Sequence, residues 1–277
     1  MPGPMGGRLL LAGCGKMGGA LLSGWLKRGM RPADVVVVEP DVKTARAVRR
    51  RHKIEVVARP RDVLLGPKNH PATVVFAVKP QSLDLVAPLY APLAGPKTVF
   101  LSIAAGKPIA YFQKKLGPGA AIVRAMPNLP ASVGRGVTVA VANRRVAKTQ
   151  RDRCDSLLKA VGEVAWIEDE ALMDAVTAVS GSGPAYVFLL VECLASAGRA
   201  AGLPADLSAR LAVETMIGAG EMLRVAGDSP ETLRRNVTSP GGTTAAALEI
   251  LMGKGGFAEL LTRAVAAAAR RSKELAG

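Results

Sequence analysis

A glycine-rich segment, Gly13 to Gly18, follows a short apolar run and directly precedes a helical pattern of apolar residues. Its sequence, GCGKMG, has the GxGxxG spacing that binds the pyrophosphate of a dinucleotide where a strand leads into a helix. The first glycine permits a tight turn, the second lets the backbone approach the phosphates, and the third lets the helix pack on the strand. N–H groups at the helix N-terminus would bind the phosphate oxygens. We predict a dinucleotide site here; the alternative is a glycine-rich turn without a ligand.

Glu39 lies 21 residues beyond Gly18, where the second predicted strand ends. A carboxylate at that place can accept a hydrogen bond from the ribose 2′-hydroxyl of NAD. It would repel the 2′-phosphate of NADP unless Lys43 or Arg46, a turn into the next helix, compensated the charge. Taken alone, Glu39 therefore favours NADH.

A second candidate anion site lies in the C-terminal half, in the segment Ser239-Pro240-Gly241-Gly242-Thr243-Thr244. Its small residues precede an Ala- and Leu-rich helical pattern, so they predict a helix N-terminus with little side-chain bulk. The free N–H groups of such a terminus can bind a small anion such as a carboxylate. A plain turn followed by Thr243 as the N-cap residue would explain the same pattern.

The side chains that other reaction classes need are scarce. Cys14, Cys154 and Cys193 form no CxxC pair, so we predict neither a disulfide framework nor a metal site. The sequence holds two histidines, and Ser180-Gly181-Ser182-Gly183 lacks the G-x-S-x-G spacing of a serine hydrolase. The first apolar run is too short for a signal peptide, so a reducing, cytoplasmic location is expected.

Charge is distributed unevenly along the 277 residues. The net charge is +15, and residues 1–165 hold 27 Lys and Arg against nine Asp and Glu. A basic half predicts an anionic partner: a phosphorylated cofactor, a carboxylate substrate, a membrane surface or a nucleic acid. The ten aromatic residues would supply base stacking for a single strand poorly. A basic NAD(P)-sensing or nucleic-acid-binding regulator is the non-enzyme alternative, although no helix-turn-helix pattern is evident.

The first 167 residues alternate short apolar runs, rich in β-branched residues, with helical patterns. This order predicts a doubly wound parallel sheet with both faces covered. The predicted strands are Leu9–Ala12, Val35–Val38, Ile54–Val57, Val74–Val78, Val99–Ile103, Ala121–Val123, Val137–Val141 and Val164–Ile167. The predicted helices among them include Met17–Lys27, Val42–His52 and Ser82–Tyr90.

After residue 170 the pattern is helical only. The predicted helices are Ala171–Val179, Pro184–Ala201, Pro204–Val225, Thr244–Leu251 and Phe257–Leu275. Apolar residues occupy more than one helix face, as Val187–Val191 shows, so we predict a subunit interface. The longest uncharged run, Ala175–Val191, is shorter than a membrane span, so no membrane segment is expected. The predicted fold is an α/β Rossmann-type domain over residues 1–166 and an all-α dimerisation domain over residues 167–277.

Six segments together resemble the Δ1-pyrroline-5-carboxylate reductase family, which makes proline. They are GCGKMGGAL, AVKPQ, SIAAG, RAMPNLP, SGSGPAYVF and VTSPGGTTAAAL, of which the last is the most specific. The resemblance runs from Leu11 to about Leu251. It implies a dinucleotide-binding domain, a helical domain that interleaves into a homodimer, frequent assembly of dimers into a decamer, and NADPH or NADH as hydride donor.

The resemblance also implies roles for single residues. Those implied for the cofactor, beside Glu39, are Ala12, Gly13, Cys14, Gly15, Lys16, Met17, Ala77, Val78, Lys79, Pro80, Ala104, Ala105 and Gly106. Those implied for the substrate are Val237, Ser239, Gly241, Gly242, Thr243 and Thr244. The Thr244 hydroxyl would be directed at the ring nitrogen as the catalytic group, and Ser180–Pro184 would help close the pocket. Two features depart from the family: many members have a small or basic residue where this chain has Glu39, and Pro60–Ala72 is longer than usual.

The implied reaction is hydride transfer from nicotinamide C4 to the C=N carbon of 1-pyrroline-5-carboxylate, giving L-proline. A protonated imine is already electrophilic, so the protein's main task would be to hold two flat rings in contact. A β-hydroxyacid-dehydrogenase-like NAD(P) oxidoreductase is the alternative enzyme. It would be expected to use a lysine after a Gly-Ser-Gly turn, and no lysine occurs between Ala160 and Gly253.

Overall fold

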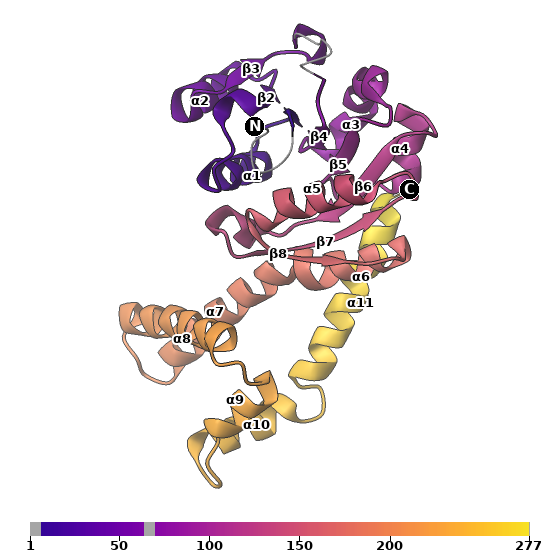
Figure 1. Cartoon of the computed structure of the whole chain (residues 1–277). Helices are drawn as coiled ribbons and strands as arrows, with labels where there is room; N and C mark the ends of the chain where they lie inside the picture. Colours follow the sequence, from indigo (N-terminus) through magenta and orange to yellow (C-terminus); the bar gives the residue numbers. More distant parts are fainter. Residues whose placement is uncertain (1–6, 64–69, 277) are drawn as a thin grey trace. The chain divides into compact units, whose positions relative to one another are not determined.

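The computed structural model describes residues 7–63 and 70–276, and the chain forms two compact units (Figure 1). One unit is Met1–Gly181 together with Ala269–Gly277, and the other is Ser182–Ala268. Residues 167–181 thus pack with the sheet, so the compact unit extends 15 residues beyond the domain boundary predicted after residue 166. About half of the predicted long segment Pro60–Ala72 lies outside the described residues.

The first unit is built on one sheet whose strands follow the order β3-β2-β1-β4-β5-β6-β7-β8. The strands are β1 (Leu9–Ala12), β2 (Val35–Val38), β3 (Glu55–Val57), β4 (Thr73–Phe76), β5 (Val99–Ser102), β6 (Ala121–Met126), β7 (Gly136–Ala142) and β8 (Gly162–Trp166). All eight predicted strands are therefore present. The strand order reverses between β1 and β4, and in such sheets ligands bind beyond the carboxyl ends of the strands at this reversal.

The sheet is mixed rather than wholly parallel as predicted. Strands β1 to β6 pair in parallel, and every residue of β1, β2, β4 and β5 is buried, as expected for a sheet covered on both faces. Strand β7, however, pairs antiparallel with β6, with Arg124 opposite Val141. The connection 127–135 has nine residues, and a parallel crossover needs a dozen or more. Connection length therefore explains the reversed strand.

Helices cover both faces of this sheet (Figure 1). One cluster of buried side chains joins the sheet to α1 (Lys16–Lys27), α2 (Val42–His52) and α5 (Lys148–Lys159). The second cluster joins it to α3 (Leu83–Val86) and α4 (Ile109–Leu116). The predicted helix Ser82–Tyr90 is only partly α-helical. From Ala87 to Leu93 the chain forms 3-10 turns, because the prolines at 88 and 92 lack the N–H groups that an α-helix needs.

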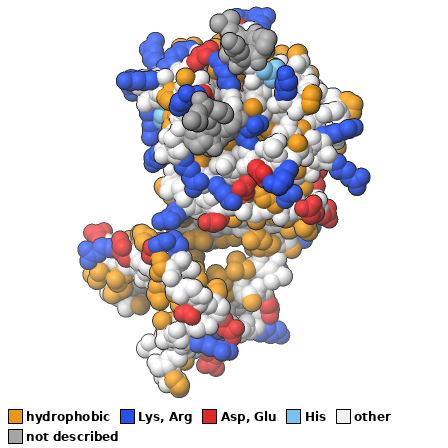
Figure 2. Space-filling view, in the orientation of Figure 1, with side chains coloured by type: hydrophobic (Ala, Val, Ile, Leu, Met, Phe, Trp, Pro, Cys, Tyr) orange, Lys and Arg blue, Asp and Glu red, His pale blue; other side chains and the backbone are white. Residues whose placement is uncertain are grey.

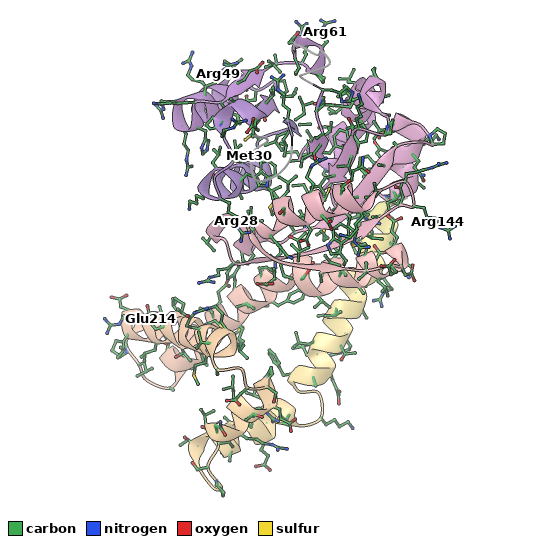
Figure 3. All side chains as sticks on the ribbon, viewed as in Figure 1. Arg28, Met30, Arg49, Arg61, Arg144 and Glu214 are labelled. Atoms are coloured by element: carbon green, nitrogen blue, oxygen red, sulfur yellow. The ribbon has the colours of Figure 1, made fainter. Side chains whose placement is uncertain are left out.

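Trp25 fixes α1 against α5. Its side chain is fully buried, and its Nε1–H donates a hydrogen bond to the Leu157 carbonyl oxygen at 2.9 Å. A Cβ atom on Gly24 would lie 2.7 Å from the Ala160 carbonyl oxygen, so the two helices approach closely there. Arg28 and Met30, labelled in Figure 3, follow the end of α1, and the Met30 side chain returns to the core. These contacts fix α1 in place, and with it the N-terminus of this helix.

The C-terminal half is helical, as predicted, and the described residues after 166 contain no strand. Its helices are α6 (Met173–Val176), α7 (Gly183–Ala200), α8 (Ala205–Val225), α9 (Pro230–Asn236), α10 (Thr243–Met252) and α11 (Phe257–Ala276). A π-helical turn, Thr177–Gly181, joins α6 to α7. Helix α6 and the end of α11 belong to the first compact unit.

Because of this π turn, the helical run does not end at Ser180–Pro184 as expected. The run Glu170–Ala200 spans 31 residues and is, by length and composition, long and apolar enough to cross a membrane, with 11% of its most apolar stretch buried. The length argument made from Ala175–Val191 is therefore wrong.

The second unit leaves apolar side chains uncovered on several helices (Figure 2). The exposed large apolar residues of α7, α8 and α10 are Val187, Phe188, Leu189, Leu190, Leu194, Leu211, Val213, Ile217, Met222, Leu223, Val225, Ile250, Leu251 and Met252. Helices α7 and α8 pack on each other, yet few of their side chains are buried, Ala195 and Ala212 among them. Apolar surface of this extent marks an interface with another molecule.

The Trp25→Ala variant should lower the free energy of unfolding by about 3–5 kcal/mol, because it removes a fully buried indole and its hydrogen bond. Chemical denaturation followed by circular dichroism measures this. Leu85→Ala is the control, since Leu85 is 80% exposed and should change the value by less than about 0.5 kcal/mol. Equal losses in the two variants would contradict the assignment of Trp25 to the core.

Candidate functional site

The turn from β1 to α1 is so tight that neither Gly13 nor Gly18 has room for a side chain. Gly13 has φ +85°, and a Cβ atom there would lie 2.8 Å from Val78 Cγ1 and 2.9 Å from the Ala77 carbonyl oxygen. A Cβ atom on Gly18 would lie 2.5 Å from the Gly13 carbonyl oxygen. The first and third glycines of the motif therefore have the packing roles that the sequence predicted.

Gly15 has the opposite environment. No atom lies within 4 Å of the position that its Cβ would occupy. Gly15 is the N-cap residue of α1, no side chain caps this terminus, and no acidic residue lies in the first turn. The first N–H groups of the helix are thus left for an anion, and the space beside Gly15 lets phosphate oxygens approach the backbone. The residues fit a dinucleotide pyrophosphate.

Three of the predicted cofactor segments are adjacent at the carboxyl edge of the sheet. Ala12 pairs with Phe76, and Phe76 pairs with Ser102, so the loops after β1, β4 and β5 begin side by side. The N–H of Ala77 donates to the Ala12 carbonyl at 2.8 Å, and the N–H of Ile103 donates to the Phe76 carbonyl at 3.1 Å. The structure thus brings together the predicted residues Ala12–Met17, Ala77–Pro80 and Ala104–Gly106.

Glu39 connects the end of β2 to the glycine-rich turn. Its Oε2 accepts a hydrogen bond from the Cys14 N–H at 2.8 Å, and its Oε1 accepts one from the Asp41 N–H at 3.0 Å. The carboxylate therefore lies beside the turn where a ribose is expected, and it also shapes the turn. Burial, together with the charge of Glu39, raises the pKa of the Cys14 thiol to about 11. Cys14 is then protonated at neutral pH, which agrees with a packing role.

A groove of about 560 Å³ lies between α1 and α2 and includes Cys14, Gly15 and Lys16 in its lining. Its charged lining residues are all basic: Lys16, Lys27, Lys43 and Arg51. His52 also lines it, and burial together with the nearby Arg51 lowers the pKa of this histidine. Part of the positive charge of the first unit therefore lies beside the predicted pyrophosphate site, where it attracts anions.

Two further motifs meet at the end of β6. A Cβ atom on Gly181 would lie 2.6 Å from Met126 Cε, so the π turn Thr177–Gly181 packs on the RAMPNLP segment. Asn128 in that segment accepts a hydrogen bond from the Val137 N–H at 3.0 Å and holds the loop in shape. The predicted pocket-closing segment Ser180–Pro184 therefore begins against the sheet unit.

The SPGGTT segment forms the start of α10 in the second unit. Its N-cap residue is Gly242, no side chain caps the helix, and Thr243 is the first helical residue. The alternative in which Thr243 is the N-cap is therefore wrong. Gly241 has φ +69°, and the Gly242 N–H donates to the Ser239 carbonyl at 3.1 Å, which closes a tight turn. Thr244 is half-buried, and Val237 is 61% exposed.

Sequence reasoning missed Glu170. Its Oε1 accepts hydrogen bonds from Arg124 Nη1 at 2.8 Å and from the Ile109 N–H at 2.9 Å, and so links three segments of the first unit. The only signal was an acidic run, Glu168-Asp169-Glu170, in a basic region, and nothing in that run distinguishes Glu170. Among the residues described, no three His, Cys, Asp or Glu side chains form a metal-binding group.

Comparison with known proteins decides the family. Residues 170–275 match the family described as pyrroline-5-carboxylate reductase dimerisation, and residues 9–106 match NADP oxidoreductase, coenzyme F420-dependent. The pyrroline-5-carboxylate reductase of Pseudomonas aeruginosa is 38% identical over 269 residues, which cover 97% of each protein. The chain belongs to the pyrroline-5-carboxylate reductase family. It is therefore an oxidoreductase.

Solved pyrroline-5-carboxylate reductases have the same fold. The Coxiella burnetii structure has a TM-score of 0.91 at 33% identity, covering 98% of this chain and 99% of that one. The Plasmodium falciparum structure, which has NADP bound, has a TM-score of 0.81 at 30% identity and covers 98% of both chains. These likenesses confirm the predicted Rossmann-type domain followed by a helical domain.

Exchange of two glycines by alanine should separate packing from ligand binding. Gly15→Ala should leave thermal stability nearly unchanged and weaken NADH binding by about tenfold or more, because the methyl group displaces the phosphates. Gly18→Ala should lower the melting temperature, because its methyl group collides with the Gly13 carbonyl. Thermal unfolding and NADH fluorescence titration measure both effects. Unchanged NADH affinity in Gly15→Ala would contradict the pyrophosphate assignment.

Proposed function

We propose that the chain catalyses hydride transfer from NADPH or NADH to the C=N carbon of 1-pyrroline-5-carboxylate, giving L-proline. Family membership supports this reaction. The single observation that best supports cofactor binding is the start of α1, which no side chain caps and which has open space at Gly15. The nicotinamide supplies the hydride, and the chain's residues bind and orient both reactants.

The residues that would hold the cofactor lie in the three adjacent loops. The turn Ala12–Met17 would bind the pyrophosphate through backbone N–H groups, and Glu39 would accept from a ribose hydroxyl. The loops Ala77–Pro80 and Ala104–Gly106 would flank the ribose and nicotinamide. Small side chains at 77, 104 and 105 leave the ring face open, so that the flat imine can stack on it.

The substrate carboxylate would be bound at the start of α10. The N–H groups of Thr243 and Thr244 belong to a helix terminus that no side chain caps, and its positive dipole end favours an anion. Thr244 would hold the proton at the ring nitrogen through its hydroxyl, while Val237 and Ser239 would border the ring. Holding the protonated imine beside the hydride donor lowers the barrier mainly through orientation, because the iminium carbon is already electrophilic.

The exposed apolar faces of α7, α8 and α10 support a homodimer, and such dimers would assemble further into a decamer. Residues 170–275 match a family described by dimerisation, which favours a second copy of the chain over a membrane as the cover of these faces. We propose no nucleic-acid or membrane partner, and a cytoplasmic location for the enzyme. Light scattering should give a mass that is a multiple of two chains of 28.7 kDa; a monomer would contradict this.

A steady-state assay with 1-pyrroline-5-carboxylate and each reduced cofactor tests the proposed reaction. L-Proline should form in step with the loss of nicotinamide absorbance. A salt titration against DNA, run beside an NADH titration, addresses the regulator alternative. DNA affinity without nucleotide binding would contradict the proposal. So would oxidation of NADPH by the oxo acid that corresponds to a β-hydroxyacid, with none by the imine.

Thr244→Ala should lower kcat by about 10- to 100-fold, because a hydrogen bond to a charged group contributes about 1.5–3 kcal/mol. NADH binding should stay unchanged, and Thr244→Ser should recover much of the rate. Thr262→Ala is a matched control, since Thr262 donates a hydrogen bond to the Ala258 carbonyl within α11. Full turnover in Thr244→Ala would remove Thr244 from the reaction.

Glu39 should make NADH competitive with NADPH. We expect kcat/KM for the two cofactors to agree within about tenfold, because the carboxylate and a 2′-phosphate repel each other by about 1 kcal/mol in a solvated site. Parallel assays with Lys43→Ala and Arg46→Ala identify any compensation by these cations. A large NADPH preference that either substitution abolishes would refute the role assigned to Glu39.

A further inference from the structure

The loop between β5 and α4, residues 103–108, is braced by segments that lie far away in the sequence. A Cβ atom on Gly106, which has φ +72°, would lie 3.4 Å from the Leu275 carbonyl oxygen near the end of α11. Directly after the loop, the Ile109 N–H donates to Glu170 Oε1 at 2.9 Å. All of these residues belong to the first compact unit.

Two acidic residues of the segment Glu170–Val176, Glu170 and Asp174, support both contacts of the loop. They lie one helical turn apart. Glu170 binds the Ile109 N–H and pairs with Arg124, whose side chain is 8% exposed. Asp174 Oδ1 accepts a hydrogen bond of 2.6 Å from the hydroxyl of Ser272 in α11, and Ser272 is 6% exposed. One turn beyond Ser272, the α11 backbone at Leu275 meets Gly106.

Helix α4 lacks a cap from its own sequence. Its N-cap residue is Pro108, which has no side-chain acceptor, and no acidic residue lies in its first turn. The carboxylate of Glu170, 61 residues away, accepts from the first helical N–H and supplies the negative charge that a helix N-terminus favours. Charge-assisted hydrogen bonds of this kind are about twice as strong as neutral ones. The end of the loop is thus fixed by Glu170, and its middle by α11.

We propose that Glu170 and Ser272 are positioning residues that hold the 103–108 loop in the shape required by the nicotinamide half of the cofactor. This inference rests on the proposed function, in which Ala104–Gly106 flank that half. Glu170 acts through the start of α4, and Ser272 acts by holding α11 against Gly106. Neither residue contacts the cofactor.

The two contacts that support the loop come from the two ends of one segment of the chain. Glu170 begins the region that matches the dimerisation family, and Leu275 ends it. The part of the chain that would form the subunit interface therefore also sets the cofactor loop. Substitutions at either end of that region should change nicotinamide binding without touching the glycine-rich turn.

The test compares two ligands on the full-length chain. NADPH contains the nicotinamide half, whereas 2′,5′-ADP lacks it. Ser272→Ala should weaken NADPH binding about threefold to tenfold, the loss expected from one hydrogen bond, and leave 2′,5′-ADP binding unchanged within about twofold. Amide hydrogen exchange at 103–109 should become faster. Ser272→Thr, which keeps the hydroxyl, should restore both properties.

Ser208→Ala is a matched control, because Ser208 is also buried and donates a 2.6 Å hydrogen bond, to the Ala195 carbonyl in the other unit. It should leave both ligand affinities and the loop exchange unchanged. Equal weakening of both ligands by Ser272→Ala, no change in either ligand, or the same selective loss in Ser208→Ala would overturn the inference.

Asp174→Asn provides a second variant if Ser272→Ala fails to fold. It keeps the side-chain shape, removes the charge of the acceptor, and should shift NADPH affinity and loop exchange in the same direction by a smaller amount. Failure of both variants to fold would overturn the inference, since it would assign the contact to overall stability. Because no measurement uses the imine, a chain that shows the selective loss but fails to reduce 1-pyrroline-5-carboxylate would contradict only the proposed substrate.

Discussion

The close approach of β1, its following turn and α1 is the constraint on which the rest of the site depends. Strand and helix come so near that a methyl group at Gly13 or Gly18 would overlap backbone atoms. This approach directs the α1 N-terminus over the reversal in strand order, where the loops after β1 and β4 diverge. Burial of Trp25 holds the helix in place from its other end. Glu39 then occupies the Cys14 N–H and fixes the turn. The result is a preformed anion site at the switch point of a sheet.

The two compact units contribute different features to a reductase. The first combines a sheet whose strands β1, β2, β4 and β5 are fully buried with most of the positive charge, and it offers backbone N–H groups at the carboxyl ends of its strands. The second offers little core of its own and many exposed apolar residues, which suit it to association. The helix start at Gly242 in this unit has small side chains and no side-chain cap, which suit a carboxylate. The segment from Glu170 and the end of α11 tie this part of the chain to the sheet.

The sequence predicted those parts of the fold that depend on local pattern. Buried β-branched runs identified all eight strands, and the glycine spacing identified the pyrophosphate turn, because both follow from short-range sterics. The direction of β7 was missed, since it depends on the length of the 127–135 connection. The run through Ser180–Pro184 was missed because a π turn continues a helix that Gly and Pro would be expected to end. Contacts across long separations, such as Glu170 with Ile109 or Ser272 with Asp174, have no local signature at all.

The central claim is that a nicotinamide ring bound at the sheet edge transfers its hydride directly to a cyclic imine. Its most direct measurement uses NADH carrying deuterium at C4 on one defined face, 1-pyrroline-5-carboxylate and the wild-type chain, with the product examined by mass spectrometry. The account predicts L-proline with one deuterium at C5 from one face of the ring and none from the other. Proline without deuterium from either face, or equal labelling from both faces, would contradict it.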